Sequence, residues 1–174
     1  METLSIYEDH LFWQYDDHLL RIDAWGKNSL RVRATKASVI DLHQDWALLP
    51  SASGKLSFER IENGVIVTNG NISATVDQQG RVIYRNQHGA RLLEEFWRQR
   101  DVGEPFWSLG ATHQKNISAL KIDGREIKPL TGEAFELTVR FESEPTEKIY
   151  GMGQYQLPHL ELKGCVLELA QRNS

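Results

Sequence analysis

The chain has 174 residues, of which 40% are hydrophobic and 25% are charged, and its formal net charge is −4. This length and this balance predict a single soluble globular domain with a core of its own. The acidic and basic residues are interspersed, which excludes the clustered lysines and arginines of a nucleic-acid-binding or anionic-membrane surface.

Alternation of apolar and polar residues predicts short strands in the first half of the chain. His18–Ala24 is the first such run, and Leu30–Thr35 follows with one apolar and one cationic face. The dipeptide Asn63-Gly64 favours a tight hairpin turn, because both residues tolerate a positive φ. Strands are then expected at residues 65–67, 72–76 and 82–84.

The second half continues the pattern with one ambiguous segment. Residues 90–100 place Leu92, Leu93, Phe96 and Trp97 at helical spacing, so a short helix and a strand both stay open there. Strands are expected at 117–122, at 135–141 and at 166–169. Such spacing indicates an antiparallel all-β sandwich or barrel rather than alternating β and α units.

The residue types that carry chemistry form no recognisable catalytic or metal-binding motif. No two of the six histidines have metal-site spacing, so we expect no metal and no cofactor. No Gly-x-Ser-x-Gly elbow is present, and Gly151-Met152-Gly153 completes no phosphate-binding fingerprint. The single cysteine, Cys165, lies in an apolar run and is expected to be a buried, inert thiol. With no possible internal disulfide, no secretory signal and no apolar run long enough for a membrane span, a reduced, cytoplasmic protein is expected.

The five tryptophans leave two readings open. Tryptophan usually fills cores and interfaces, but a solvent-facing row of Trp13, Trp25, Trp46 or Trp107 would form a platform for sugar rings and favour a stand-alone carbohydrate-binding module. Another possible function, that of a mutarotase-like enzyme, would need two histidines beside one glutamate in a concave sheet.

The stretch Glu147–Gln154, with the sequence E-K-I-Y-G-M-G-Q, resembles the E-x-x-Y-G-x-G-[EQ] signature that ends the N-terminal region of family 31 glycoside hydrolases. Four other stretches resemble the same family in the same order, so that the resemblance covers most of the chain beyond about residue 18. They are residues 30–35 (L-R-V-R-A-T), 71–95, 135–143 and the segment with Lys163-Gly164 and Gln171-Arg172-Asn173.

The resemblance implies a fold and a chemical context. In the family this region is a β-sandwich of the galactose-mutarotase type that packs on a (β/α)₈ barrel, which favours a strand at residues 92–95. The parent enzymes are retaining α-glycosidases that act on α-xylosides or α-glucosides. Their two catalytic aspartates lie on the barrel, and the W-x-D-M-N-E type of motif is nowhere in this sequence. Retaining hydrolysis needs both carboxylates, so we expect no catalytic residue in this chain.

The chain is therefore expected to be a single N-terminal domain over residues 1–174 that stops before its last strands and before the barrel. The resemblance places Asn173 and Arg172 at the rim of the sugar pocket, as substrate-binding residues. The expected partner is the missing barrel, with carbohydrate bound only in that context. A sheet without its last strands exposes an edge, so the chain alone is also expected to form a homo-oligomer.

Overall fold

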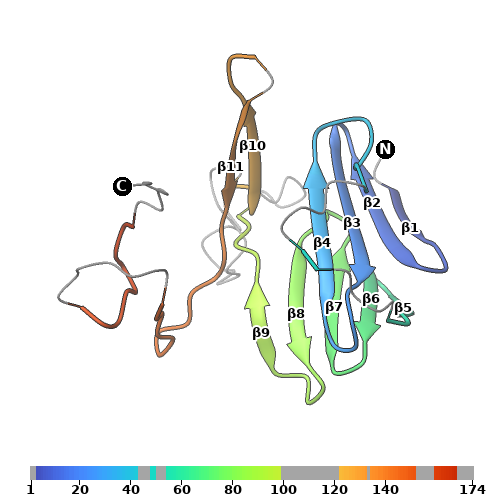
Figure 1. Cartoon of the computed structure of the whole chain (residues 1–174). Helices are drawn as coiled ribbons and strands as arrows, with labels where there is room; N and C mark the ends of the chain where they lie inside the picture. The colour runs from blue at the N-terminus through green and yellow to red at the C-terminus, as the bar shows by residue number, and fades with distance from the viewer. Residues whose placement is uncertain are drawn as a thin grey trace, which may run out of the picture. The chain divides into compact units, whose positions relative to one another are not determined.

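A computed structural model of the chain describes residues 3–42, 48–49, 54–98, 122–132, 134–151 and 159–167. Within these ranges the protein is all-β, without a helix (Figure 1). The chain divides into two compact units, Met1–Glu142 and Ser143–Ser174. The prediction of one domain over residues 1–174 stays a prediction.

The first sheet of the larger unit has four antiparallel strands in sequence order. They are β1 (Thr3–Ile6), β2 (His10–Tyr15), β3 (His18–Ala24) and β4 (Leu30–Thr35). The predicted strands 18–24 and 30–35 are thus confirmed with the same bounds. The register sets Trp13 opposite Leu20 and Leu11 opposite Ile22, so these four side chains share one face.

The second sheet has five antiparallel strands, again in sequence order. They are β5 (Ser57–Ile61), β6 (Gly64–Asn69), β7 (Ile72–Asp77), β8 (Val82–Asn86) and β9 (Arg91–Glu94). A tight hairpin turn joins β5 to β6, but it lies one residue earlier than predicted: Ile61 pairs with Gly64, so the two turn residues are Glu62 and Asn63 and Gly64 begins β6. Gly64 has a φ of 156°, within the range that favours glycine.

The core lies between the two sheets. Their facing side chains form one buried apolar cluster, and Val65, Val67 and Val76 of the second sheet are fully inaccessible to solvent. The first sheet contributes Leu11, Trp13, Leu20 and Ile22, and the second contributes the three valines with Ala74 and Val82. The predicted antiparallel β-sandwich is confirmed.

The ambiguous segment 90–100 forms a strand in its described part, so the helical reading is wrong. After β9, Glu95 forms a bridge with Phe141, and Arg98 forms one with Ile122. The Glu95 N–H donates to Val82 O on one side, and the Phe96 N–H donates to Arg140 O on the other. Backbone pairing on both sides outweighs the helical spacing of the apolar residues.

A two-stranded ribbon completes the larger unit. It consists of β10 (Arg125–Pro129) and β11 (Phe135–Val139), paired so that Ile127 lies opposite Leu137. The predicted strand at 135–141 is confirmed for residues 135–139, with a bridge at Phe141. The predicted strand at 117–122 lies outside the described residues except for Ile122.

The smaller unit has no strand among its described residues. Val166 and Leu167 lie in irregular structure, whereas residues 168 and 169 of the predicted last strand fall outside the described ranges. Cys165 is exposed, so the expectation of a buried thiol is wrong. In the part of the chain that is described, no helix has the length and apolar character needed to cross a membrane.

Candidate functional site

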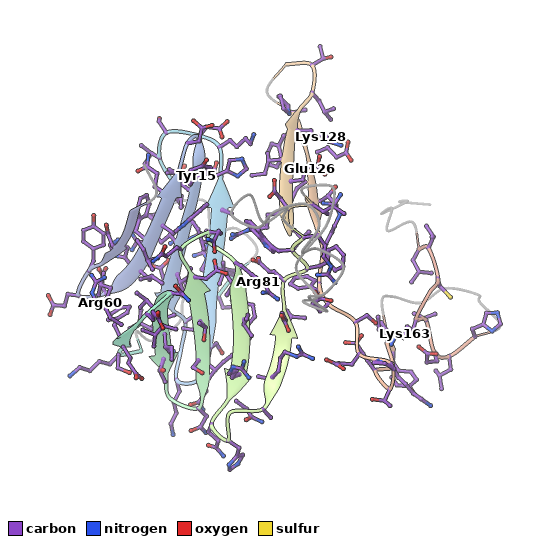
Figure 2. The ribbon with its side chains drawn as sticks, turned by 180° about the vertical axis from the view of Figure 1, so that it is seen from behind. Tyr15, Arg60, Arg81, Glu126, Lys128 and Lys163 are labelled. Carbon is purple, nitrogen blue, oxygen red and sulfur yellow. The ribbon has the colours of Figure 1, made fainter. Side chains whose placement is uncertain are left out.

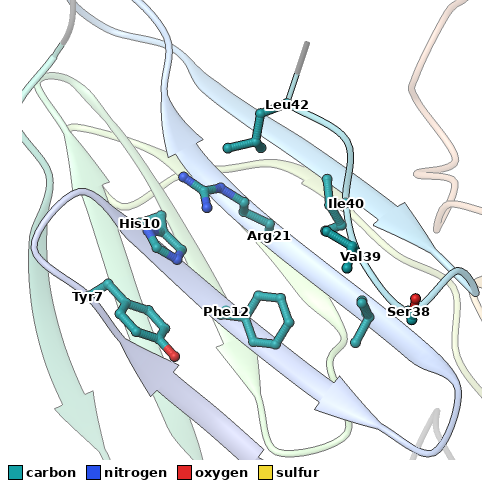
Figure 3. Close-up of a pocket in the computed structure, with 9 residues that line it drawn as sticks. Tyr7, His10, Phe12, Arg21, Ser38, Val39, Ile40 and Leu42 are labelled. Atoms are coloured by element: carbon teal, nitrogen blue, oxygen red, sulfur yellow. The ribbon is translucent and has the colours of Figure 1, made fainter. Parts of the chain in front are cut away.

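The outer face of the first sheet carries a cavity of about 290 Å³ (Figure 3). Its floor comes from β2 and β3, and the segment after β4 forms one side. Nine residues line it: Tyr7, His10, Phe12, Leu19, Arg21, Ser38, Val39, Ile40 and Leu42.

Strand alternation explains why these side chains meet. Leu11 and Trp13 point into the core, so His10 and Phe12 point outward, and the same alternation turns Arg21 outward on β3. Leu19 is only 5% exposed although it lines this outer cavity. Phe12 and Leu19 therefore put apolar surface on the side of the sheet opposite the core.

Charged groups border the cavity and are already paired. The rings of Tyr7 and His10 are stacked, with 4.4 Å between centroids, and His10 Nδ1 lies 2.7 Å from Asp9 Oδ1. The hydrogen bond with His10 lowers the pKa of Asp9, and burial opposes this shift. The Arg21 guanidinium lies 2.7 Å from one oxygen of Asp23, and Arg33 Nη2 donates to the other oxygen at 2.7 Å.

The lining residues limit the chemistry of this cavity. None of the nine carries a carboxylate, and glycoside hydrolysis needs two carboxyl groups about 5–9.5 Å apart. The aromatic and aliphatic lining suits a small apolar or ring-shaped group. The sequence offered one signal for this cavity, namely the apolar Phe12 and Leu19 at positions opposite the core-facing residues.

A second polar cluster lies where the five-stranded sheet meets the ribbon. Glu95 is 3% exposed, and its Oε2 accepts a hydrogen bond of 2.9 Å from the Val82 N–H. Its Oε1 lies 3.4 Å from Arg125 Nε. Burial raises the pKa of Glu95, and the positive charge of Arg125 opposes that shift. Because its partners come from β8 and β10, this carboxylate has a structural role as a cross-link between elements.

More ion pairs surround this junction. Arg81 and Arg91 both pair with Glu94, and Arg98 Nη1 donates to Glu142 Oε1 at 2.5 Å. Figure 2 shows the side chain of Arg81 among the strands of the second sheet. Each carboxylate of these pairs has an arginine partner. None of these carboxylates lines the cavity on the first sheet.

The predicted rim residues Arg172 and Asn173 lie outside the described residues, and their assignment stays a prediction. Of the signature residues 150–154, only Tyr150 and Gly151 are described, and both are exposed. Gly151 has a φ of 92°, a backbone conformation in which a side chain would be strained.

The described tryptophans do not form the exposed row that a sugar platform needs. Trp13 is 5% exposed, and its Nε1 donates to Gln78 O at 2.8 Å. Arg31 lies over the half-buried ring of Trp25 at 4.8 Å. Trp46 and Trp107 lie outside the described ranges. Among the residues described, no group of three or more His, Cys, Asp or Glu could hold a metal ion.

Comparison with known proteins gives two close matches. A protein described as an uncharacterized family 31 glucosidase of Pseudescherichia vulneris is 49% identical over 180 residues, which span 100% of this chain. The crystal structure of a GH31 α-xylosidase from a soil metagenome, complexed with xylose, matches 98% of this chain with a TM-score of 0.85 and 47% identity. No protein-family profile matches the chain. The chain spans 32% of the first protein and 25% of the second, about a third or less of either.

Proposed function

Because this chain corresponds to part of a family 31 glycoside hydrolase, we propose that it is an accessory β-sandwich domain of a retaining α-glycosidase. In this proposal it packs on a catalytic barrel and shapes the rim of the sugar pocket. The observation that carries the proposal is the match over the whole of this chain to a minor part of two such enzymes.

The substrate class proposed is an α-xyloside or an α-glucoside, because the matched proteins are described as an α-xylosidase and a glucosidase. Hydrolysis would require carboxylates from the rest of the enzyme. The location proposed is the cytoplasm, which the single cysteine favours.

A segment exchange tests the role. The matched quarter of the soil-metagenome α-xylosidase is replaced by this chain to give a chimera, which is compared with the intact enzyme, with the enzyme lacking that quarter, and with this chain alone. We expect the chimera to hydrolyse an aryl α-xyloside, and the truncated enzyme and the chain alone to show no turnover above buffer.

Two results would contradict this role. One is an inactive chimera that is nevertheless folded and as soluble as the intact enzyme. The other is turnover by the chain alone that survives repurification and disappears when a residue of this chain is mutated.

Sugar binding by the chain alone gives an independent check. A domain that supplies only part of a pocket offers few of the convergent polar groups that tight binding of a small ligand requires. We expect xylose and glucose to bind no more tightly than about 1 mM, an affinity of about −4 kcal/mol. Micromolar affinity in calorimetry would instead support a stand-alone carbohydrate-binding module.

A further inference from the structure

One face of the β10–β11 ribbon is apolar and open to solvent. Phe135, Leu137 and Val139 occupy alternate positions of β11, and their exposed fractions are 62%, 52% and 41%. The register sets Leu137 opposite Ile127 and Phe135 opposite Pro129. Because directly opposed residues point to the same side of a ribbon, these side chains form one apolar face that we call the ribbon face.

The other face of the ribbon is polar. Glu126 pairs with Lys128 at 3.2 Å and with Arg140 at 2.9 Å. Glu136 and Thr138 lie on the same side by alternation, and Figure 2 marks Glu126 and Lys128 on β10. The ribbon is therefore amphipathic, as is typical of a strand pair with one face packed against protein and the other exposed to solvent.

An open ribbon face needs a cover. Large exposed apolar patches mark sites of association. The core cluster of the sandwich includes no residue of β10 or β11, so the ribbon face is separate from that core.

We infer that the ribbon face is the surface on which the remaining part of a family 31 glycosidase docks, through its exposed apolar side chains. This inference rests on the proposed function. The matched enzymes contain enough further chain to cover this face, because the matched part is only 32% of one and 25% of the other. Arg125, opposite Val139 at the base of the ribbon, is the charged residue on this side of β10. Its side chain is 10% exposed and lies 3.4 Å from Glu95, so the surface that the face presents to solvent is apolar and fits an apolar partner surface.

Hydrogen exchange in the α-xylosidase chimera described above tests this. Backbone amides of residues 125–139 are compared between the chimera and the chain alone. Burial of the ribbon face should slow their exchange in the chimera by roughly tenfold or more, because local opening then also breaks the docking contact. Leu137→Ser and Phe135→Ser should each remove most of this protection and speed thermal inactivation of the chimera several-fold.

Matched substitutions on the polar face, Glu136→Gln and Thr138→Ser, should change neither quantity. In the chain alone, Leu137→Ser should leave the urea midpoint nearly unchanged, which separates lost docking from failed folding. Leu137→Ala, which keeps an apolar side chain, should give an intermediate effect.

The outcomes separate this inference from the proposed function. An active chimera in which the ribbon amides exchange as fast as in the chain alone would overturn the docking surface and leave the proposed function standing. High protection already in the chain alone would overturn it too, since the cover would then be another segment of this chain or a second copy. An inactive chimera would count against the proposed function instead.

Discussion

Removing the side-chain amide of Asn69 should destabilise the sandwich strongly for one polar residue. Asn69 ends β6 in the second sheet and is 2% exposed. Its Nδ2 donates to Gly26 O at 2.9 Å and to Ser29 O at 2.7 Å, both in the connection between β3 and β4 of the first sheet. One amide therefore ties the two sheets together at this end of the core.

The size of the effect follows from these contacts. Asn69→Ala loses two hydrogen bonds worth about 1 kcal/mol each. Ser29 O keeps the Trp25 N–H as a donor, whereas Gly26 O loses the Asn69 donor at a partly buried site, which adds up to about 1 kcal/mol. The expected loss is about 2–3 kcal/mol in the free energy of unfolding, or roughly 4–12 °C in the thermal midpoint for a chain of this size.

Urea and thermal unfolding followed by circular dichroism measure this loss. Asn69→Asp keeps the shape but turns the donor into an acceptor that faces two carbonyl oxygens, so it should cost at least as much as alanine. Asn63→Ala, at an exposed asparagine in the β5–β6 turn, serves as the control and should stay within about 0.5 kcal/mol of the parent. A loss below about 1 kcal/mol for Asn69→Ala would refute this account of how the sheets are tied.

Three further predictions concern a tight turn, a titrating imidazole and the pocket rim. Gly80→Ala combines a φ of 82° with a new Cβ 2.6 Å from the Trp13 ring, so it should lower the free energy of unfolding in urea by about 2–4 kcal/mol. Gly89→Ala is the control: Gly89 has a φ of 77° but open space around it, so the loss should be only about 1–2 kcal/mol. Equal losses for the two variants would contradict the packing argument. Burial, and secondly the positive charge of Lys36, lower the pKa of His18 below 6.5. The imidazole therefore binds a proton more tightly in the unfolded chain than in the folded one, so the free energy of unfolding should fall as the pH drops below 6.5. An NMR titration midpoint for His18 at or above 6.5 would disprove this prediction. In the α-xylosidase chimera, Asn173→Ala should lower kcat/KM about tenfold, the value of one hydrogen bond, and unchanged kinetics on several substrates would remove this residue from the rim.

The sequence predicted the sandwich because its signals were local. Alternation over 18–24 and 30–35 and the turn signal at Asn63-Gly64 depend on neighbouring residues. The structure has both strands, and it has the turn one residue earlier than predicted. At residues 90–100 the local pattern left helix and strand both open. The choice depends on pairing partners elsewhere in the chain, because β9 pairs with β8 and Phe96 donates to Arg140 O.

The candidate sites were harder to predict for the same reason. The cavity on the first sheet joins Tyr7 to Val39 and Leu42, and only the folded sheet brings these residues together. The sequence predicted the apolar side of β11, because Phe135, Leu137 and Val139 alternate with polar residues. Alternation predicts which side of a strand is apolar, but it does not say whether the same chain covers that side.

The backbone pairing at Glu95 and Phe96 has a mechanical consequence. Glu95 is bonded to β8 on one side, while Phe96 is bonded to the residue that follows β11 on the other, so the sheet and the ribbon share one continuous hydrogen-bonded backbone. The pair Arg98–Glu142 adds a side-chain brace at the same place. The base of the ribbon is thus fixed to the sheet by main-chain hydrogen bonds and does not depend on a loop alone. A load applied near its tip would be transmitted into the sandwich through several main-chain bonds at once, and small rotations of the sheet would be amplified along the length of the ribbon.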